Sequence, residues 1–410
     1  MGMKDFNGHG AILADEMGLG KTLQAITLIW TLLKQSAIAN TTAPVKRALI
    51  VCPATLCQNW KHEFGKWLGD ERIRVFVLEE KADIKDFTVG KVFSVLICGY
   101  ERLRVCKDAI LGAGFDIVIA DEGHRLKNKQ IQASQIISAL KTPRRVILSG
   151  TPIQNDLGEF HAMCDLVNPG VLGNRNTFSS VYETPILAAR DPKATQEEIT
   201  LGQERSQELQ RITQDFILRR TSAIFTDAGS ASKLPPKTEI TLFIRMSPVQ
   251  QTAYEHIVAH SLVKRVIGDT AGSGKNVLGY LTVLKKLVNS AALMNEDSVS
   301  ANELGVTKRL ASKYDMDALT GFELSSKLET LSAILTEIRN TTNEKVVVIS
   351  NWTQTLDLVQ DLLKEKEMTY LRLDGQTDSS KRQNLVDQFN NSTANASFVS
   401  CFQQKRVEWD

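Results

Sequence analysis

Short apolar runs alternate with helical patterns through the first 160 residues. The apolar runs are nearly continuous, which is typical of strands that are buried on both faces. Between them, apolar residues recur at spacings of three and four, as on one face of a helix. This order predicts the α/β class, with a parallel sheet covered by helices on both faces. The expected strands are Ala48–Cys52, Ile73–Leu78, Phe93–Cys98, Phe115–Ala120 and Val146–Ser149, and one expected helix face carries Leu56, Trp60, Phe64 and Trp67.

The pattern changes beyond residue 156. Strand runs become scarce and charged helical stretches such as Gln196–Ile217 dominate, which predicts a mainly helical insertion. Pro235 and Pro236 break this insertion near its middle and mark the expected passage between two halves. The predicted organisation is a first lobe at 1–156, the insertion at 157–324 and the beginning of a second lobe at 325–410.

The alternating pattern resumes in the last 86 residues, from 325 to 410. It predicts the opening of a second α/β lobe. The expected elements are a strand at Val346–Ser350, a helix at Thr355–Lys366, a strand at Tyr370–Leu373, a helix at Lys381–Phe389 and a strand near Phe398.

Composition adds limits to this picture. At about 150 residues per domain, 410 residues predict two or three domains. Lys and Arg number 49 against 47 Asp and Glu, so any phosphate-binding surface has to come from local placement of basic groups. No run of about 18 apolar residues exists, so we expect no membrane span and no membrane partner. The six cysteines form no C-x-x-C pair, which favours reduced core residues of an intracellular protein.

The stretch DEMGLGKT, Asp15–Thr22, follows the apolar run Ala11–Ala14 and opens the helical pattern Leu23–Leu33. This is the strand, loop and helix context of a P-loop, in which glycines let backbone N–H groups face a phosphate. Lys21 would reach the β and γ phosphates, and the Thr22 hydroxyl would bind Mg²⁺. The alternative is a Gly-rich turn that binds no nucleotide. The expected nucleotide-binding residues here are Asp15, Gly18, Leu19, Gly20, Lys21 and Thr22, although Asp15 stands where the general pattern has its first glycine.

A second stretch, AGSGKN at 271–276, is similar to a P-loop. Asn276 replaces the hydroxyl residue, and no strand pattern precedes it. It therefore predicts a flexible loop without a nucleotide.

Two acidic residues follow the apolar run in FDIVIADEGH, at 115–124. Ligands of open α/β sheets collect at the carboxyl ends of the strands, so Asp121 is placed to bind Mg²⁺ directly or through water. Glu122 is placed to orient the attacking water and to accept its proton. The alternative is a solvated acidic turn. The expected catalytic residues are Lys21, Asp121 and Glu122, and the expected metal ligands are Thr22 and Asp121.

A third strand end, LSGTPIQND at 148–156, carries small polar residues. Gly150 and Thr151 are the expected nucleotide contacts in it. Taken alone, this stretch is an ordinary strand end, and its weight comes from its order and spacing after the other two.

The order of these motifs resembles the SNF-type branch of the superfamily-two helicase-like ATPases. DEMGLGKT, DEGH at Asp121–His124 and Gly-Thr-Pro at Gly150–Pro152 carry the resemblance, which spans nearly the whole chain. Within this branch, EFGKWL, GTPIQNDL and ISNWTQTLD are most similar to the recombination-repair subgroup. Further matching stretches are CPATLCQNW at 52–60, GYERL at 99–103, FILRRT at 216–221, LPPKT at 234–238 and RLDGQT at 372–377.

The resemblance implies two recombinase-like lobes of the P-loop NTPase type and an enzyme that hydrolyses ATP with Mg²⁺. It implies a nuclear translocase on double-stranded DNA that acts in homologous recombination and double-strand break repair by remodelling protein–DNA complexes. The implied partners are double-stranded DNA and the filament of a strand-exchange recombinase, with nucleosomes as a further one.

The resemblance also implies contacts to DNA phosphates, which carry no sequence information. For Thr55 and Tyr100, helix capping or packing is an equal alternative. The implied DNA contacts are Thr55 and Tyr100 in the first lobe and Asn351, Trp352 and Thr353 in the second.

The chain departs from the family pattern at both ends. A glutamine motif expected upstream of Asp15 is missing, and the pattern ceases after Val399, before a Gly-rich loop and a box of arginine fingers. Because such a finger is worth about 10³ to 10⁵ in rate, we expect the chain as given to hydrolyse ATP poorly. The expectation is a truncated or mis-spliced form with an incomplete second lobe, and the alternative is a genuine short form.

Two other functions remain open at this point. One is a truncated protein that binds ATP or DNA without effective hydrolysis. The other is a general chromatin remodeller of the same superfamily.

Overall fold

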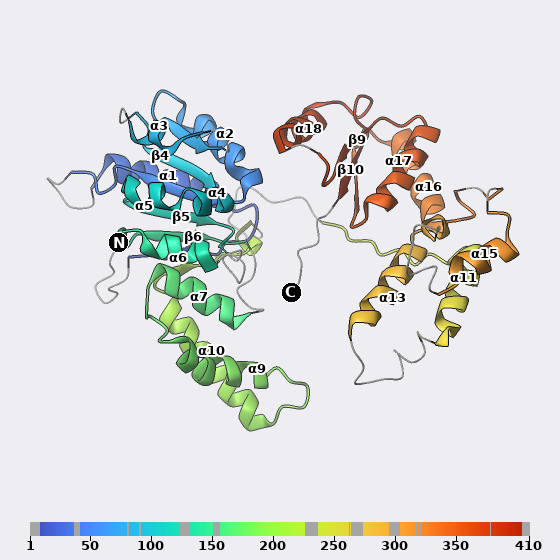
Figure 1. Cartoon of the computed structure of the whole chain (residues 1–410), viewed down its shortest axis with the longest axis horizontal. Helices are drawn as coiled ribbons and strands as arrows, with labels where there is room; N and C mark the ends of the chain where they lie inside the picture. The colour runs from blue at the N-terminus through green and yellow to red at the C-terminus, as the bar shows by residue number, and fades with distance from the viewer. Residues whose placement is uncertain are drawn as a thin grey trace. The chain divides into compact units, whose positions relative to one another are not determined.

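The computed structural model describes residues 9–403 except 37–41, 80–81, 90–91, 124–130, 151–155, 226–236, 262, 264–273, 295–303, 317, 320 and 378. The chain forms two compact units, Met1–Pro236 and Lys237–Asp410 (Figure 1). The first unit extends past the predicted end of the first lobe at 156, and the second begins before 325. The three-part division stays a prediction.

The first unit is built on a sheet of seven strands, all parallel, in the order β3-β4-β2-β5-β6-β1-β7. The α/β class is thereby confirmed, and the strands predicted from apolar runs lie within two residues of the observed ones. β7 was not predicted. The strands are β1 (Ala11–Leu13), β2 (Ala48–Cys52), β3 (Val75–Leu78), β4 (Val95–Gly99), β5 (Ile117–Asp121), β6 (Arg145–Leu148) and β7 (Ile217–Leu218).

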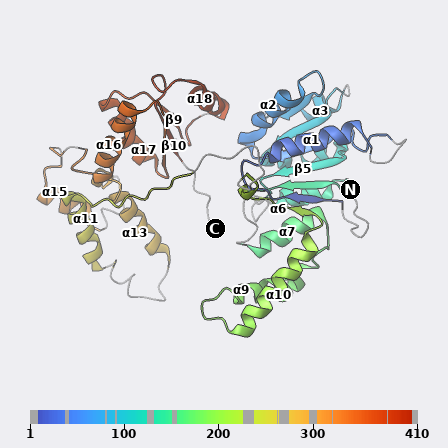
Figure 2. The ribbon, with the colours of Figure 1, turned by 180° about the vertical axis from the view of Figure 1, so that it is seen from behind.

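Helices cover both faces of this sheet. The helices α4, α5 and α6 lie in front of it in Figure 1, and α1 lies in front of it in the view from behind in Figure 2. The flanking helices are α1 (Lys21–Lys34) and α2 (Cys57–Leu68) on one face, and α3 (Ile84–Thr88), α4 (Tyr100–Val105), α5 (Lys107–Ala113), α6 (Ile131–Ala139) and α7 (Leu157–Val167) on the other.

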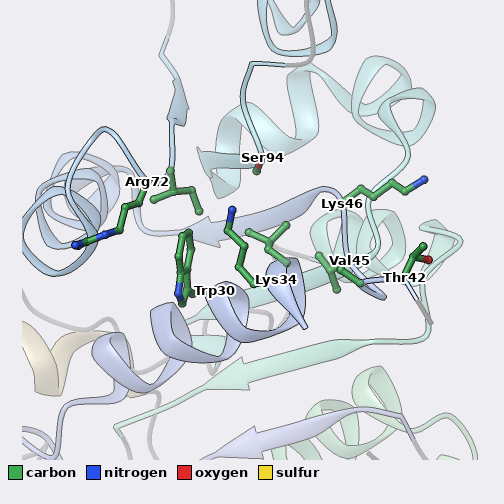
Figure 3. Close-up of a pocket in the computed structure, with 10 residues that line it drawn as sticks. Trp30, Lys34, Thr42, Val45, Lys46, Arg72 and Ser94 are labelled. Atoms are coloured by element: carbon green, nitrogen blue, oxygen red, sulfur yellow. The ribbon is translucent and has the colours of Figure 1, made fainter. Parts of the chain in front are cut away.

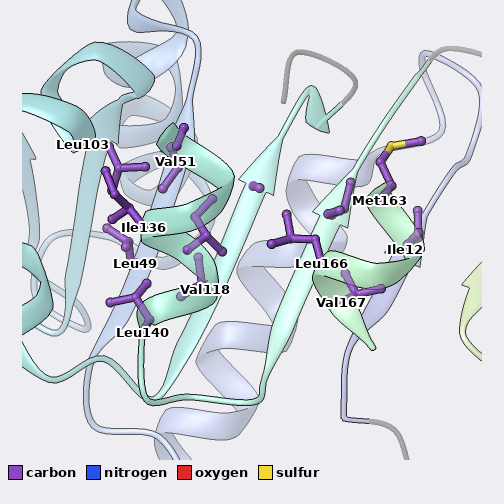
Figure 4. Packing of buried hydrophobic residues seen from close by; sticks show 14 of the residues in the cluster. Ile12, Leu49, Val51, Leu103, Val118, Ile136, Leu140, Met163, Leu166 and Val167 are labelled. Atoms are coloured by element: carbon purple, nitrogen blue, oxygen red, sulfur yellow. The ribbon is translucent and has the colours of Figure 1, made fainter. Parts of the chain in front are cut away.

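Strand β2 shows why its sequence is continuously apolar. Its side chains alternate between the two faces, as in any strand. Leu49 and Val51 pack against α4 and α6 (Figure 4). Ile50 packs with α1 and α2 on the other face. All five residues of the strand are buried, so no position can be polar.

The rest of the first unit leaves the sheet and returns to it. Helix α10 begins with a capping box in which the Thr195 side chain accepts from the Glu198 N–H and the Glu198 carboxylate accepts from the Thr195 N–H. After α10 the chain reaches β7, which pairs with β1 at the edge of the sheet. The elements of this excursion are α8 (Arg175–Phe178), a π-helical turn (Ser179–Glu183), α9 (Thr184–Ala188), α10 (Gln196–Thr213), β7 and a 3-10 turn (Ser222–Phe225).

The second unit has two buried clusters. One lies among helices, and the other lies between two helices and a parallel sheet in the order β8-β10-β9. The predicted strands and helices after residue 325 are confirmed. The elements are α11 (Pro248–Ala259), α13 (Gly274–Leu287), α15 (Val306–Lys313), α16 (Ser326–Thr341), β8 (Val346–Ser350), α17 (Thr353–Glu365), β9 (Tyr370–Leu373), α18 (Ser379–Asn391) and β10 (Val399–Gln403), with a 3-10 turn at Ala291–Leu293.

The expectation of a loop at 271–276 is wrong for its second half. Residues 271–273 lie outside the described part of the chain, and Gly274 begins α13. Farther along this helix, Val283 and Leu287 are buried in the helical cluster. Such tertiary packing stabilises a helix beyond its local propensity and overrides the loop character of Gly-Lys-Asn.

Two further properties follow from the described residues. All six cysteines are free thiols, and five of them are buried. Among the helices that the structure describes, none has both the length and the apolar character that crossing a membrane requires.

Candidate nucleotide site

The loop between β1 and α1 has the backbone geometry that its sequence predicts. Gly18 and Gly20 have φ values of 88° and 73°, in the left-handed region that favours glycine. Gly20 precedes α1 without a side-chain cap, so the first N–H groups of that helix are not used by a capping side chain. Leu19 lies between the two glycines. A helix start of this kind, after a Gly-rich turn, attracts a phosphate group.

Lys21 and Thr22 are the first two residues of α1, and both are half-buried. The Lys21 Nζ donates to the carbonyl oxygens of Asp15, at 2.8 Å, and of Glu16, at 3.2 Å. Both acceptors are backbone atoms of the loop, so a phosphate can replace them without breaking an ion pair. The residues present therefore fit a nucleotide phosphate.

Gly150, at the end of β6, lies directly beside this loop. A Cβ atom built on Gly150 would lie 3.5 Å from the Lys21 Nζ and 3.3 Å from the Met17 Cγ. The structure thus brings the third predicted stretch against the first. Thr151 lies outside the described residues.

Asp15 occupies a different environment from the rest of the loop. Its side chain is fully buried, and it accepts hydrogen bonds from the backbone N–H of Arg220 at 2.9 Å, from the Arg220 guanidinium and from the Gln24 amide at 3.3 Å. Burial alone would raise the pKa of Asp15, but the hydrogen bonds from Arg220 and Gln24 outweigh it and hold the pKa below its ordinary value. The carboxylate is therefore ionised and paired within the protein.

The acidic pair lies at the carboxyl end of β5. The Asp121 carboxylate accepts from the Trp60 indole N–H at 2.9 Å and from the Glu122 backbone N–H at 3.0 Å. Burial raises the pKa of Asp121, and the Trp60 hydrogen bond and the positive charge of Lys21 oppose that shift only in part. Asp121 pairs with Leu148 of β6, and Gly150 just beyond β6 lies beside Lys21, so Lys21 and Asp121 lie at the same edge of the sheet.

Glu122 has a backbone φ of 53°, in the left-handed region. For a residue other than glycine this conformation costs on the order of 1–3 kcal/mol, and such residues cluster at functional sites. The turn at the end of β5 is thus a place where the backbone is strained.

The predicted DNA contacts of the first unit differ in exposure. Thr55 is exposed in a 3-10 turn (Ala54–Leu56) before α2. Tyr100 is only 4% exposed, and its hydroxyl donates to the Asp121 carbonyl oxygen at 2.7 Å. This placement favours packing, the alternative to DNA contact, for Tyr100.

The other predicted contacts lie in the second unit, where β8 passes into α17. Asn351 is exposed, Trp352 precedes the first residue of α17, and Thr353 begins that helix. The Lys286 ammonium lies 5.8 Å from the centre of the Trp352 ring. A cation and an aromatic ring in this arrangement attract each other.

Two hollows of the first unit lie away from this site. One, of about 340 Å³, is lined by residues just before β2, β3 and β4 and by the end of α1, including Trp30, Lys34 and Arg72 (Figure 3). The other, of about 580 Å³, lies beside the start of β6 and includes Arg145. Both are at the amino ends of strands, the edge opposite to the phosphate loop, and neither is lined by a predicted site residue.

Sequence reasoning missed three supporting side chains. Gln24 and Arg220 hold Asp15, and Trp60 holds Asp121. The helical spacing of Trp60 predicted its burial but gave no sign of a partner for its N–H. FILRRT, which contains Arg220, was a signal in the sequence only through the resemblance.

Two parts of the chain match known protein domains. Residues 1–293 match the SNF2-related domain, and residues 326–401 match the helicase conserved C-terminal domain. A solved structure, the Sulfolobus solfataricus SWI2/SNF2 ATPase core in complex with dsDNA, is similar with a TM-score of 0.46 at 22% identity, over 97% of this chain and 74% of that one.

Several curated proteins are more similar in sequence. DNA repair and recombination protein RAD54B of Gallus gallus is 41% identical over 404 residues, 95% of this chain and 43% of that protein. Protein CHROMATIN REMODELING 25 of Arabidopsis thaliana is 42% identical over 408 residues, 94% of this chain and 44% of that protein. DNA repair and recombination protein RDH54 of Saccharomyces cerevisiae (strain AWRI1631) is 38% identical over 417 residues, which are 96% of this chain and 44% of that protein.

The chain thus spans less than half the length of these relatives. The match to the SNF2-related domain nevertheless covers well over half of its 410 residues. The protein belongs to the SNF2-related family.

Proposed function

We propose that this chain carries the ATP-hydrolysing part of a translocase on double-stranded DNA that acts in homologous recombination and double-strand break repair. The observation that carries the proposal is the placement of Lys21, Gly150 and Asp121 at the carboxyl edge of one parallel sheet. Ligands of open α/β sheets bind at this edge. The RAD54B and RDH54 relatives are named as DNA repair and recombination proteins, which supports a role of this chain in the same processes.

The residues of the site divide the work as follows. The glycines of the loop and the start of α1 take the phosphates of ATP, and the Lys21 ammonium leaves its two carbonyl acceptors to bind the β and γ phosphates. Thr22 and Asp121 would hold Mg²⁺, which would neutralise phosphate charge when bound. Glu122 orients the attacking water and accepts its proton. Gly150 would line the side of the nucleotide that faces the end of β6, and Thr151 is proposed as a nucleotide contact from the sequence alone.

DNA would be held through its phosphates. Thr55 in the first unit, and Asn351, Trp352 and Thr353 in the second, are the proposed contacts, and the buried Tyr100 is not among them. Contacts of this kind are independent of base sequence and weaken as salt rises. We propose a nuclear location and a strand-exchange recombinase filament as the protein on which the motor acts.

The test measures ATP binding and ATP hydrolysis, each with and without duplex DNA. Glu122→Gln should bind a fluorescent ATP analogue as tightly as the wild type and lose the slow ATP hydrolysis that we expect of the wild type, because only proton acceptance is lost. Duplex DNA should increase the rate of ATP hydrolysis by the wild type but not by Glu122→Gln. A wild type that binds ATP and duplex DNA but never hydrolyses would instead support the binding-only alternative.

A second candidate is chromatin remodelling. It is favoured by the likeness to Protein CHROMATIN REMODELING 25 of Arabidopsis thaliana. Nucleosome repositioning and removal of recombinase from duplex DNA, measured side by side with the same preparation, separate the two substrates.

A further inference from the structure

We propose that Arg220 is a positioning residue of the phosphate loop. It binds the Asp15 carboxylate and thereby holds the loop in the conformation that directs Lys21 toward a bound phosphate. The inference rests on the proposed binding of ATP at this loop. It concerns a residue that lies 205 positions from Asp15 in the sequence.

The backbone provides the first step. The N–H groups of Ile12, Ala14 and Glu16 donate in turn to carbonyl oxygens of the segment that ends at Arg220. Ile12 lies within β1, whereas Ala14 and Glu16 follow it. The last of these bonds, from the Glu16 N–H to the Arg220 carbonyl oxygen, is 3.0 Å long. The ladder of the sheet thus continues past the end of β1 and into the loop itself.

The side chain of Arg220 provides the second step. Its Nε lies 3.1 Å and 3.0 Å from the two oxygens of Asp15, and its Nη2 donates to Asp15 and to the Gln24 side chain. Gln24 in turn donates to the Leu19 carbonyl oxygen at 3.0 Å. The guanidinium therefore ties the first residue of the loop, its middle and the first turns of α1 into one network. A fork of this kind restricts geometry as well as adding charge attraction.

The third step links this network to the phosphate-binding group. Asp15 accepts Arg220 through its carboxylate and accepts the Lys21 ammonium through its carbonyl oxygen. Without the Arg220 contact, Asp15 would be free to move, and its carbonyl oxygen would no longer hold the Lys21 ammonium in place. Because its Nε and Nη2 are used on Asp15 and Gln24, Arg220 acts through the loop.

The neighbouring Arg219 offers a matched control. It is exposed, has the same charge and is adjacent in the chain. A general effect of charge near the site would appear in both arginine variants, whereas an effect of loop positioning would appear in only one.

The experiment compares Arg220→Gln with Arg219→Gln in two measurements on the 410-residue protein. The first is amide hydrogen exchange of residues 14–19 without nucleotide, and the second is the affinity for a fluorescent ATP analogue with Mg²⁺. We expect the amide hydrogens of residues 14–19 to exchange faster in Arg220→Gln than in the wild type. We also expect this variant to bind the analogue about 10- to 100-fold more weakly, since small misplacements of binding groups have effects of this size. Arg219→Gln should match the wild type in both.

A buried aspartate without its partner can prevent folding, so the double variant Asp15→Asn, Arg220→Gln belongs to the set. The double variant removes both charges and should fold, and its loop amide hydrogens should exchange as fast as those of Arg220→Gln. Wild-type loop protection and affinity in Arg220→Gln, or in the double variant if the single one does not fold, would overturn the proposal. A wild type that binds no ATP analogue would refute the proposed function, and the exchange measurement would still decide the role of Arg220.

Discussion

The indole N–H of Trp60 donates a 2.9 Å hydrogen bond to the carboxylate of Asp121. Trp60 lies on α2 and is 1% exposed, whereas Asp121 is the last residue of β5. A helix that packs on one face of the sheet therefore fixes a carboxylate at the edge of the sheet. Hydrogen bonds to charged groups contribute more than neutral ones, about 1.5–3 kcal/mol each.

Trp60→Phe should lower the free energy of unfolding by at least about 1.5–3 kcal/mol, because it leaves a buried carboxylate short of a donor and also leaves a cavity where part of the indole was. It should also raise the Mg²⁺ concentration needed for nucleotide binding. Urea unfolding and a Mg²⁺ titration of ATP-analogue binding measure the two effects.

Trp67 is the control for this prediction. It lies on the same helix, is 45% exposed, and its N–H donates to Glu63. Trp67→Phe should change stability by no more than about 0.5 kcal/mol. Equal changes in the two variants would mean that the Trp60 hydrogen bond contributes nothing specific.

Lys21→Ala should weaken binding of the ATP analogue by about 10- to 100-fold, because a charge-assisted contact of about 1.5–3 kcal/mol is lost. Lys34, in the last turn of the same helix, lies 4.7 Å from the centre of the Trp30 ring. Lys34→Ala removes the same charge from the other end of α1 and should leave nucleotide affinity unchanged. Comparable losses in both variants would place the nucleotide elsewhere.

Much of the fold was predictable because its cause is local. The fully buried β2 reads as a continuous apolar run, and Gly18 and Gly20 occur where the backbone needs a left-handed conformation. The positions of Lys21 and Asp121 at one edge follow from the rule that parallel strands end together.

The supporting contacts were not predictable, since their causes are distant in the chain. β7 has two residues, too few for any periodicity, and is defined only by its pairing with β1. The partner of Asp15 is likewise 205 residues away. Tyr100 could be read from its sequence as a DNA contact or as a packing residue, and only its burial beside Asp121 distinguishes them.

Tyr100→Phe and Thr55→Ala should therefore behave differently. Tyr100→Phe loses the hydrogen bond to the Asp121 carbonyl oxygen and should lower stability by about 1 kcal/mol, without changing affinity for duplex DNA. Thr55→Ala should weaken DNA binding and leave stability nearly unchanged. Fluorescence anisotropy with a labelled duplex, at two salt concentrations, measures affinity. Weaker DNA binding by Tyr100→Phe at full stability would return Tyr100 to the DNA surface.

The ion pair of Asp15 predicts a pH dependence of stability. Its pKa lies below the ordinary value of 3.8 in the folded state, so the stabilisation is complete above that value and is lost as pH falls through the lowered pKa. Asp15→Asn does not titrate. The difference in free energy of unfolding between wild type and Asp15→Asn should be constant from about pH 5 to 8 and shrink below about pH 4.

Urea unfolding of both proteins across this range provides the measurement. Loss of the pair should cost toward the lower end of about 3–5 kcal/mol at neutral pH, because Arg220 is 38% exposed and is partly screened by solvent. A difference that stays the same down to pH 3 would show that Asp15 is not the titrating group.

The late return of the chain at β7 sets an order of events during protein synthesis. The phosphate loop is made before its partner Arg220, which follows Asp15 in the chain by 205 residues. At about 5–20 residues per second, the ribosome needs roughly 10–40 s to supply it. A growing chain therefore carries the phosphate loop for many seconds without the strand that completes its sheet edge. We expect such chains to bind ATP weakly, so that nucleotide capture begins only once β7 has left the ribosome.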